Sequence, residues 1–225
     1  MRLSGYGLRV WLAATVAAAV VVSVLGWLGW WWVMAAVCIA WLGVISFFRD
    51  PARPAPEDLS AGSMLSPADG RITAVEQVPE HAATGGPAVV IRIFLSVLDV
   101  HVNRAPADGR VLAVEHRPGR HHDARTRSSA AVNESTLITI ALDSGESIGV
   151  RQIAGKVARR IVCTLSPGDC LRRGERFGMI LFGSGTELIL PRPADVAVRV
   201  RVGQKVFGGR TELATLRLRA DCVKA

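Results

Sequence analysis

The chain has 225 residues, of which half are hydrophobic, and a formal net charge of +8 at pH 7. This length allows one soluble domain plus an anchor and excludes two full-size domains. Its four cysteines, Cys38, Cys163, Cys170 and Cys222, form no CxxC pair, which argues against a zinc site and a disulfide framework. The arginines are scattered and lack an aromatic platform, so the charge favours anionic lipid over nucleic acid as a partner.

Residues 10–48 contain no charged residue and include all six tryptophans. A spanning helix needs about 20 apolar residues, so this segment predicts an α-helical hairpin of two short helices joined near residues 26–29. Arginines on both sides of the segment favour a cytoplasmic location for both ends and for the domain that follows. A cleaved signal peptide is disfavoured because the apolar run is too long. A re-entrant hairpin in one leaflet stays open.

The remaining chain predicts a mainly β fold. We expect an anchor over residues 1–48, a proline-rich linker over 49–59 and a β-rich domain over 60–225. Short runs of β-forming residues separated by Gly, Pro and Asp are typical of a compact β-sandwich or barrel-like domain. Glycine spacing in the last third of the chain is similar to that of lipoyl-type hairpins.

An internal repeat lies within this domain. PADGRITAVE at 67–76 recurs almost unchanged as PADGRVLAVE at 106–115. Asp-Gly followed by alternating β-formers is a turn leading into a strand, so the repeat predicts two copies of one hairpin in a pseudo-symmetric sheet.

The string FGSGTELILP at 182–191 combines a turn-like Gly-Ser-Gly-Thr with two apolar flanks. Alone, these four residues predict an ordinary hairpin turn. Four other strings precede it in a fixed order, namely FFRDP at 47–51, SPADG at 66–70, FLSVLDVHVNRAP at 94–106 and QIAGKVARRIV at 152–162. Together the five strings resemble the phosphatidylserine decarboxylase family, in its short membrane-anchored bacterial form.

The resemblance implies a proenzyme that cuts its own chain between Gly183 and Ser184. Ser184 would attack the Gly183 carbonyl, and glycine at that position tolerates strained geometry. Elimination and hydrolysis would leave a covalent pyruvoyl group derived from Ser184, which would decarboxylate phosphatidylserine to phosphatidylethanolamine through a Schiff base. The two fragments would stay associated at the cell membrane, and a homodimer is compatible with an edge-rich β domain.

Two further residues receive roles from the same resemblance. His101 is the expected base for self-cleavage or the proton donor at the substrate Cα. Asp69 matches an aspartate that orients a histidine toward the serine, although Asp-Gly is also a standard turn pair. The chain departs from one branch of the family at Arg104, where a second histidine would stand, and at Gly185, where threonine or arginine is usual.

Other interpretations stay open. The substrate could be a related serine-headed lipid such as archaetidylserine, and a membrane-tethered β-sandwich adaptor without chemistry is an alternative of another class. The polar stretch at 115–135 predicts a surface loop that could bind phosphate or carboxylate. The roles of Arg117, Arg120, His121, Asn133 and Glu134 in it are left open.

Overall fold

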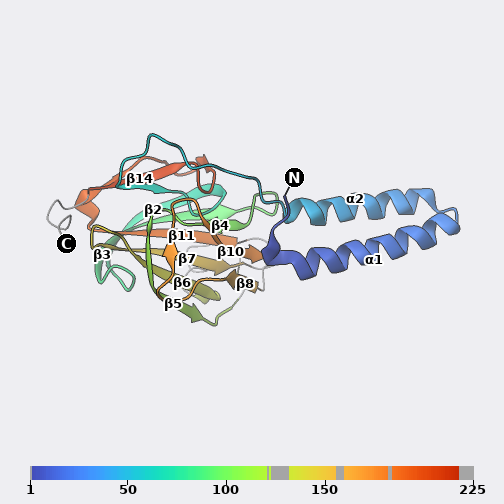
Figure 1. Ribbon diagram of the computed structural model, residues 1–225, viewed down its shortest axis with the longest axis horizontal. Coiled ribbons are helices and arrows are strands. Elements are labelled where there is room, and N and C mark those ends of the chain that lie inside the picture. Colours follow the sequence, from blue (N-terminus) through green and yellow to red (C-terminus); the bar gives the residue numbers. More distant parts are fainter. Residues whose placement is uncertain (1, 121, 123–131, 156–159, 182–183, 218–225) are drawn as a thin grey trace. The chain divides into compact units, whose positions relative to one another are not determined.

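The computed structural model describes residues 2–120, 122, 132–155, 160–181 and 184–217. The chain divides into two compact units, Met1–Ala52 and Arg53–Ala225, which are described separately. Strands make up 43% of the structure and helices 22%. The expected fold class, a mainly β domain preceded by an apolar helical segment, is confirmed (Figure 1).

The first unit is a pair of apolar helices. It contains η1 (Gly5–Gly7), α1 (Leu8–Trp27) and α2 (Trp31–Phe47). The stretch Gly5–Trp27 is 23 residues long and contains an 18-residue window with a mean hydropathy of 2.2, so it is long and apolar enough to cross a membrane, whereas α2 is shorter. A glycine at position 29 with φ of +71° makes the turn between them, close to the expected place.

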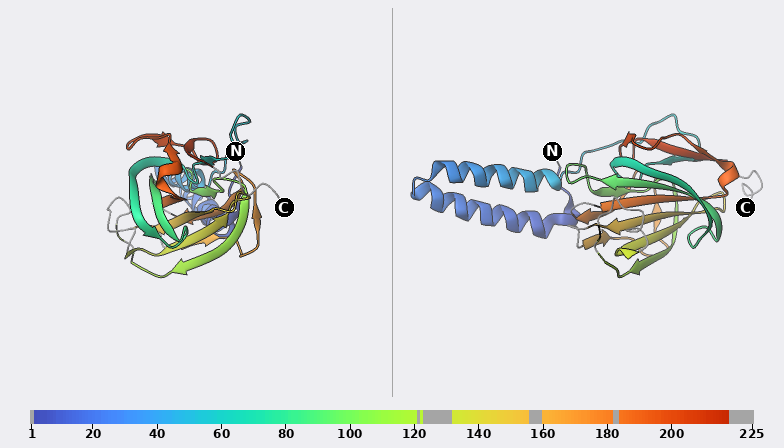
Figure 2. Two further views of the ribbon diagram at one scale, coloured as in Figure 1. Left: turned by 90° about the vertical axis from the view of Figure 1, so that its left-hand side faces the viewer. Right: turned by 180° about the vertical axis from the view of Figure 1, so that it is seen from behind.

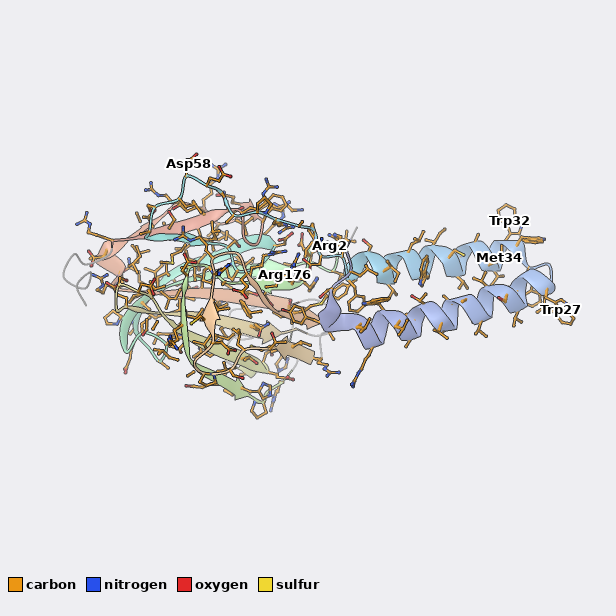
Figure 3. The ribbon with its side chains drawn as sticks, in the orientation of Figure 1. Arg2, Trp27, Trp32, Met34, Asp58 and Arg176 are labelled. Atoms are coloured by element: carbon orange, nitrogen blue, oxygen red, sulfur yellow. The ribbon has the colours of Figure 1, made fainter. Side chains whose placement is uncertain are left out.

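Tryptophans gather at that turn. Trp27 and Trp32 are 87% and 90% exposed and extend from the end of the helix pair (Figure 3). Between the helices, the Trp41 indole nitrogen donates to Thr15 Oγ1 at 3.1 Å, and that hydroxyl donates to the Trp11 carbonyl at 2.7 Å. The side chains of Trp41 and Thr15 are therefore satisfied within the hairpin, as suits polar groups on apolar helices.

The second unit is built from fourteen strands within the described residues. They are β1 (Ser63–Leu65), β2 (Gly70–His81), β3 (Gly86–Leu95), β4 (Val102–Arg104), β5 (Gly109–Arg117), β6 (Ser135–Ala141), β7 (Ser147–Ala154), β8 (Arg160–Cys163), β9 (Cys170–Leu171), β10 (Arg176–Leu181), β11 (Ser184–Pro191), β12 (Val196–Val198), β13 (Lys205–Val206) and β14 (Glu212–Leu216), with a short helix η2 (Pro193–Asp195).

Eight of the strands form one curled antiparallel sheet in the order β13-β2-β3-β11-β7-β6-β5-β9. Two three-stranded sheets, β1-β14-β12 and β4-β10-β8, complete the unit. The left view of Figure 2 shows the large sheet curling around the interior. Aliphatic side chains from both ends of the sheet fill that interior, among them Ile72, Ile91, Ile93, Ile138, Ile140, Val150 and Leu188.

The strand order is pseudo-symmetric about the β11–β7 pair. Reading outward, β11, β3, β2 and β13 correspond to β7, β6, β5 and β9, and the sheet β1-β14-β12 corresponds to β4-β10-β8. The unit β4–β10 is continuous in sequence, whereas its counterpart is made of β1–β3 and β11–β14. One repeat is therefore inserted into a hairpin of the other, between β3 and β11.

The two copies of the PADG turn explain their shared glycine. A Cβ at Gly70 would lie 2.1 Å from the Phe94 carbonyl oxygen, and one at Gly109 would lie 2.4 Å from the Ala141 oxygen. Only glycine allows the partner strand so close. The strand that follows each turn carries a bulge at the same place, after Ile72 and after Val111. The predicted repeat of one hairpin is confirmed.

Candidate active site

Ser184 is the first residue of the central strand β11. It pairs with Leu95 on β3 and with Ala154 on β7. Its side chain is fully buried, and its Oγ makes no hydrogen bond to the described part of the chain. A buried hydroxyl without a partner costs about 1–3 kcal/mol, so its retention points to chemistry rather than to stability. Gly183, the other half of the predicted cut site, lies outside the described residues.

His101 lies at the end of the loop between β3 and β4 and is fully buried. Its carbonyl accepts a hydrogen bond from the Ile180 backbone nitrogen at 3.2 Å. Ile180 lies near the end of β10 and precedes Ser184 by four residues, so His101 packs beside the end of β10. Its Nδ1 is 2.9 Å from the Asp99 carbonyl oxygen. Since a carbonyl only accepts, Nδ1 carries the proton, and in the neutral ring Nε2 holds the lone pair of a base.

A buried polar cluster joins the strands around Ser184. Asn103 Nδ2 donates to Thr186 Oγ1 at 3.2 Å and to the Pro67 carbonyl at 3.3 Å. Gln152 Nε2 donates to Asn103 Oδ1 at 2.9 Å. All three side chains are fully buried. The cluster therefore connects the SPADG, HVNRAP, QIAG and GSGT strings at one place.

Gln152 leaves one polar atom of this cluster unused. Its Oε1 is buried and has no hydrogen-bond partner among the described residues. Gln152 pairs with Thr186, and Ala154 pairs with Ser184. Gln152 Oε1 and Ser184 Oγ, the two oxygens without a partner among the described residues, therefore belong to neighbouring positions on one face of the β7–β11 pair. Our sequence analysis assigned nothing to Asn103, Gln152 or Thr186. Their place inside three of the quoted strings was the available signal.

Asp69 binds groups other than the histidine. Its carboxylate makes a bidentate ion pair with Arg53, with Oδ2 accepting from Nη2 at 2.7 Å, and Oδ1 accepts from the Gly208 backbone nitrogen at 2.8 Å. In the other repeat, Asp108 Oδ1 accepts in the same way from the Arg173 backbone nitrogen at 3.0 Å. The backbone contact is thus a turn feature that both copies share, and the ion pair with Arg53 distinguishes Asp69.

Arg104 and Gly185, the two departures from the family pattern, differ in their surroundings. Arg104 is buried, and its Nη1 donates to the Gly174 carbonyl at 3.1 Å. A Cβ at Gly185 would lie 3.6 Å from the Ile93 carbonyl oxygen, which is an ordinary contact. The position after Ser184 can therefore take a small side chain without displacing backbone.

The opposite face of β11 holds a charged group. The buried Glu187 accepts from Arg92 Nε at 2.8 Å and from Arg151 Nη1 at 3.3 Å. Arg151 Nη2 also lies 3.1 Å from His81 Nε2. Burial, followed by the charge of Arg151, lowers the pKa of His81 below its ordinary value of 6.5, and Glu187 opposes this. His81 is therefore neutral in the folded protein near pH 7.

The polar loop residues have structural contacts where the chain is described. Asn133 is buried, and its Nδ2 donates to the Ala154 carbonyl at 2.8 Å, next to Ser184 in the sheet. Glu134 Oε1 lies 3.9 Å from His116 Nε2. Arg117 and Arg120 are exposed. His121 lies outside the described residues. Asn133 thus fixes the end of the loop to β7.

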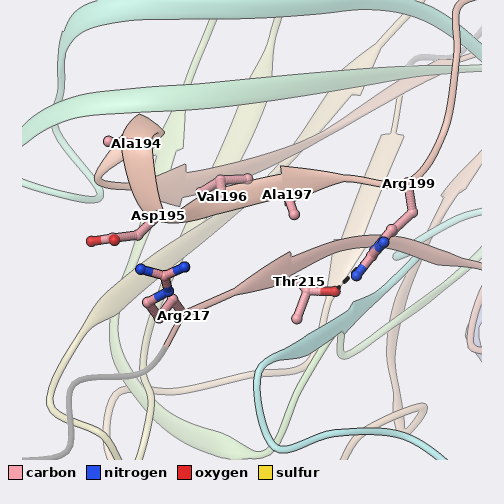
Figure 4. Close-up of a pocket in the computed structure, with 7 residues that line it drawn as sticks. All are labelled: Ala194, Asp195, Val196, Ala197, Arg199, Thr215 and Arg217. Carbon is pink, nitrogen blue, oxygen red and sulfur yellow. Dashed lines mark hydrogen bonds between the residues drawn. The ribbon is translucent and has the colours of Figure 1, made fainter.

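A surface cavity of about 350 Å³ lies elsewhere, along β12 and the end of β14 (Figure 4). It is lined by Asp195, Arg199, Thr215, Arg217 and three small or aliphatic residues. Arg199 Nε donates to Thr215 Oγ1 at 3.3 Å within it. None of the residues considered above lines this cavity. Among the described residues, no group of three or more His, Cys, Asp or Glu side chains is arranged to hold a metal ion.

Comparison with known proteins places the chain in a family. Residues 42–214 match the family model of phosphatidylserine decarboxylase. The phosphatidylserine decarboxylase proenzyme of Symbiobacterium thermophilum is 43% identical over 201 residues, covering 89% of this chain and 92% of that protein. The proenzyme of Desulfotalea psychrophila is 44% identical over 170 residues, covering 76% and 78%. The proenzyme of Rhodopirellula baltica is 39% identical over 215 residues, covering 92% and 85%. The chain belongs to the phosphatidylserine decarboxylase family.

Proposed function

We propose that this chain is a phosphatidylserine decarboxylase proenzyme, which converts phosphatidylserine to phosphatidylethanolamine after cutting itself before Ser184. The observation that carries the proposal is the buried, unpartnered Oγ of Ser184 at the start of the central strand. A hydroxyl held away from water and from hydrogen-bond donors keeps its lone pairs for attack on a neighbouring carbonyl.

In self-cleavage, Ser184 Oγ attacks the carbonyl carbon of Gly183 and loses its proton to a base, for which His101 Nε2 is the candidate. The C–N bond breaks as the amide nitrogen takes a proton, which leaves an ester. Removal of the Ser184 Cα proton then expels the Gly183 carboxylate and forms dehydroalanine. Water converts this residue to a pyruvoyl group and releases ammonia, so atoms and charge balance.

Asp69 remains a proposed contributor to cleavage. Its ion pair with Arg53 and its bond to Gly208 fix the SPADG turn, whose Pro67 carbonyl accepts from Asn103 in the buried cluster. These contacts support a positioning role that acts through the cluster. A direct bond from Asp69 to His101 would need another arrangement of the carboxylate, since Arg53 and Gly208 occupy it here.

The pyruvoyl ketone would supply an electron sink for loss of the substrate carboxylate as CO2. The surrounding residues fit such a group. The site is buried, and the unpartnered Gln152 Oε1 offers an acceptor for an amino group beside it. His101 is the candidate acid that would return the proton to the substrate Cα.

The products of the cut would be a fragment of residues 1–183 and a fragment beginning at Ser184. The small fragment contains β11, which is hydrogen-bonded to β3 on one side and β7 on the other. The two fragments should therefore stay associated, because β11 can leave the large fragment only if its hydrogen bonds to both neighbouring strands break.

The domain arrangement and location are part of the proposal. Residues 1–48 would anchor the protein in the cell membrane, 49–59 would link the anchor to the catalytic domain at 60–225, and arginines on both sides of the apolar segment favour the cytoplasmic face. Arg53, within the linker, already pairs with Asp69 of the β unit.

Denaturing electrophoresis with mass spectrometry tests the proposal. We expect two fragments, the smaller of about 4–5 kDa in proportion to 24.1 kDa for 225 residues, with a blocked N-terminus at position 184. Ser184→Ala should give one band. Ser147→Ala is the matched control, because Ser147 begins β7 as Ser184 begins β11, and it should cleave normally. A folded wild-type protein that stays intact would refute self-cleavage. A separate assay defines the substrate: CO2 release is compared between serine-headed lipids with acyl tails and those with ether tails.

A further inference from the structure

The loop between β3 and β4 has an apolar tip. Val97 and Leu98 are 52% and 81% exposed, although Leu95 before them and Val100 and His101 after them are buried. Phe207, on the segment after β13, is 44% exposed. We call Val97, Leu98 and Phe207 the apolar tip. Exposed aliphatic and aromatic side chains of this kind mark interaction surfaces when they gather at one place.

The tip is held in a fixed shape. Asp99 Oδ2 accepts from the Ser96 backbone nitrogen at 2.9 Å, and the Asp99 nitrogen donates to the Ser96 carbonyl at 2.8 Å. The Leu98 nitrogen donates to Ser96 Oγ at 3.2 Å. These bonds close a tight turn with the two aliphatic side chains outermost. The exposure is therefore a property of an ordered turn.

A cation connects the parts of the apolar tip. Lys205 Nζ lies 3.6 Å from Asp99 Oδ1 and 5.8 Å from the centre of the Phe207 ring. Its side chain is half exposed. The neighbouring Arg71, which pairs with Lys205 in the sheet, is also exposed. Although Asp99 partly neutralises Lys205, the exposed Arg71 adds a positive charge beside the apolar side chains. An apolar surface edged by positive charge is complementary to an anionic lipid surface, where acyl chains lie beneath negative head groups.

The tip is also directly connected to the candidate catalytic groups. Leu95, the cross-strand partner of Ser184, precedes Leu98 by three residues, and His101 follows it by three. Consecutive Cα atoms are 3.8 Å apart, so the Leu98 Cα lies within about 11 Å of the Leu95 Cα. The polar region of a bilayer is about 5–8 Å thick on each side. A tip seated at the hydrocarbon boundary would thus hold Leu95, and with it Ser184 on the neighbouring strand, close to the head-group layer.

The geometry points to the apolar tip as a membrane-docking element that inserts into the surface of an anionic bilayer and places the catalytic pocket over lipid head groups. This inference rests on the proposed function, because an enzyme with a soluble substrate would not need to dock on a membrane. Docking itself is a physical property that can be measured without catalysis.

The direct test measures insertion. All four native cysteines are replaced by alanine, Leu98→Cys is labelled with an environment-sensitive fluorophore, and the full-length protein is reconstituted into vesicles containing anionic lipid. Leu112→Cys is the matched control, since Leu112 is 49% exposed on β5, which β11 reaches only through β7 and β6. We expect quenching by lipids spin-labelled near the head group at position 98 and not at 112. Absence of quenching at 98, or equal quenching at both, would overturn the inference.

A second test uses activity. Leu98→Asp should reduce decarboxylation of phosphatidylserine in vesicles roughly tenfold or more, because an aspartate resists entry into the interface. It should leave self-cleavage and the turnover of monomeric short-chain phosphatidylserine unchanged, as should Leu112→Asp. Equal loss on both substrates, or no loss on vesicles, counts against docking. A wild-type protein that inserts at position 98 but decarboxylates neither substrate would refute the proposed function and leave the docking element standing.

Discussion

Ser184 and His101 are both fully buried, Ser184 at the start of the central strand β11 and His101 at the end of the loop between β3 and β4. The Asp99 carbonyl fixes the proton of His101 on Nδ1. A base whose tautomer is set by a backbone carbonyl does not need a carboxylate partner to present its lone pair. Under the proposed function, His101 could therefore act as a base while Asp69 is bound to Arg53.

Replacement of His101 tests its role as the base. We expect His101→Ala to slow self-cleavage about 100-fold or more, since general base catalysis contributes that much or more. Added imidazole should restore part of the rate if the lost group was a base. His116→Ala, at a half-exposed position on β5, is the control and should cleave normally. Both rates can be followed as loss of precursor on denaturing gels, and unchanged cleavage in His101→Ala would exclude this histidine.

The buried cluster gives a second prediction at the residue scale. Asn103→Ala removes the acceptor of Gln152 and the donor of Thr186, and each buried polar group left unpaired costs about 1–3 kcal/mol. We expect lower thermal stability and slower self-cleavage. Gln77→Ala, at an exposed position on β2, is the control. If Asn103→Ala changed stability and left the cleavage rate unaltered, the cluster would be structural only.

His81 predicts a pH dependence of stability. Because burial and Arg151 lower its pKa in the folded protein, the unfolded chain binds a proton first as the pH falls. Stability should therefore be intact above pH 6.5 and decrease below it, down to the folded pKa. The melting temperature measured between pH 8 and pH 5 should fall less for His81→Gln than for the wild type. Parallel curves for the two proteins would refute this assignment.

At the scale of elements, the two PADG hairpins are the repeated unit of the sheet. In each, glycine meets a partner carbonyl within 2.4 Å of where a Cβ would stand. The same close approach in both repeats means that each turn serves packing, and among the described residues Asp69 forms an ion pair while Asp108 forms none. The two turns thus share the same backbone packing and differ in the ion pair of Asp69.

Alanine substitution tests this equivalence. Gly70→Ala and Gly109→Ala should each destabilise the β unit by about 1–3 kcal/mol, because the partner strand must move away. Gly86→Ala is the control, since no atom lies within 4 Å of a Cβ there. The measurement is the loss of near-ultraviolet circular dichroism on heating. An unchanged midpoint for either variant would contradict the close packing described for it.

Sequence patterns predicted the apolar helix pair, the β-rich class and the repeated hairpin, because each of these depends on residues close together in the chain. They did not predict that Asn103, Gln152 and Thr186 would meet. Those contacts join residues 49 and 83 positions apart. Asn103 and Gln152 both belong to the inserted repeat, whereas Asn103 and Thr186 meet across the two repeats. The partner of Asp69 was missed for a related reason, since Arg53 had been placed in a linker.

At the scale of the whole β unit, the candidate site occupies the place where the inserted repeat leaves and rejoins its host. The equivalent position in the other repeat, between β6 and β7, is closed by a short turn in which the Leu142 nitrogen donates to the Glu146 carbonyl. Opening that hairpin brings the loop before His101 and the strand that begins at Ser184 to one end of the sheet. The symmetry of the scaffold is therefore broken where chemistry is proposed.

The central position of β11 predicts the fate of the small fragment. After cleavage, it should co-purify with the large fragment through gel filtration under native conditions and separate only in denaturant, because β3 and β7 hydrogen-bond to it on both sides. Separation in mild detergent would contradict the strand order described above.

The distance in sequence between β3 and β11 affects the folding and maturation of the protein. Some ninety residues separate Leu95 from Ser184, and pairing them costs less once the inserted repeat has folded and brought its own ends together. Under the proposed function, a chain that stalls halfway does not bury its serine beside a base and stays uncut. Maturation then acts as a checkpoint, and only molecules that have completed the long-range pairing gain the means to act on lipid.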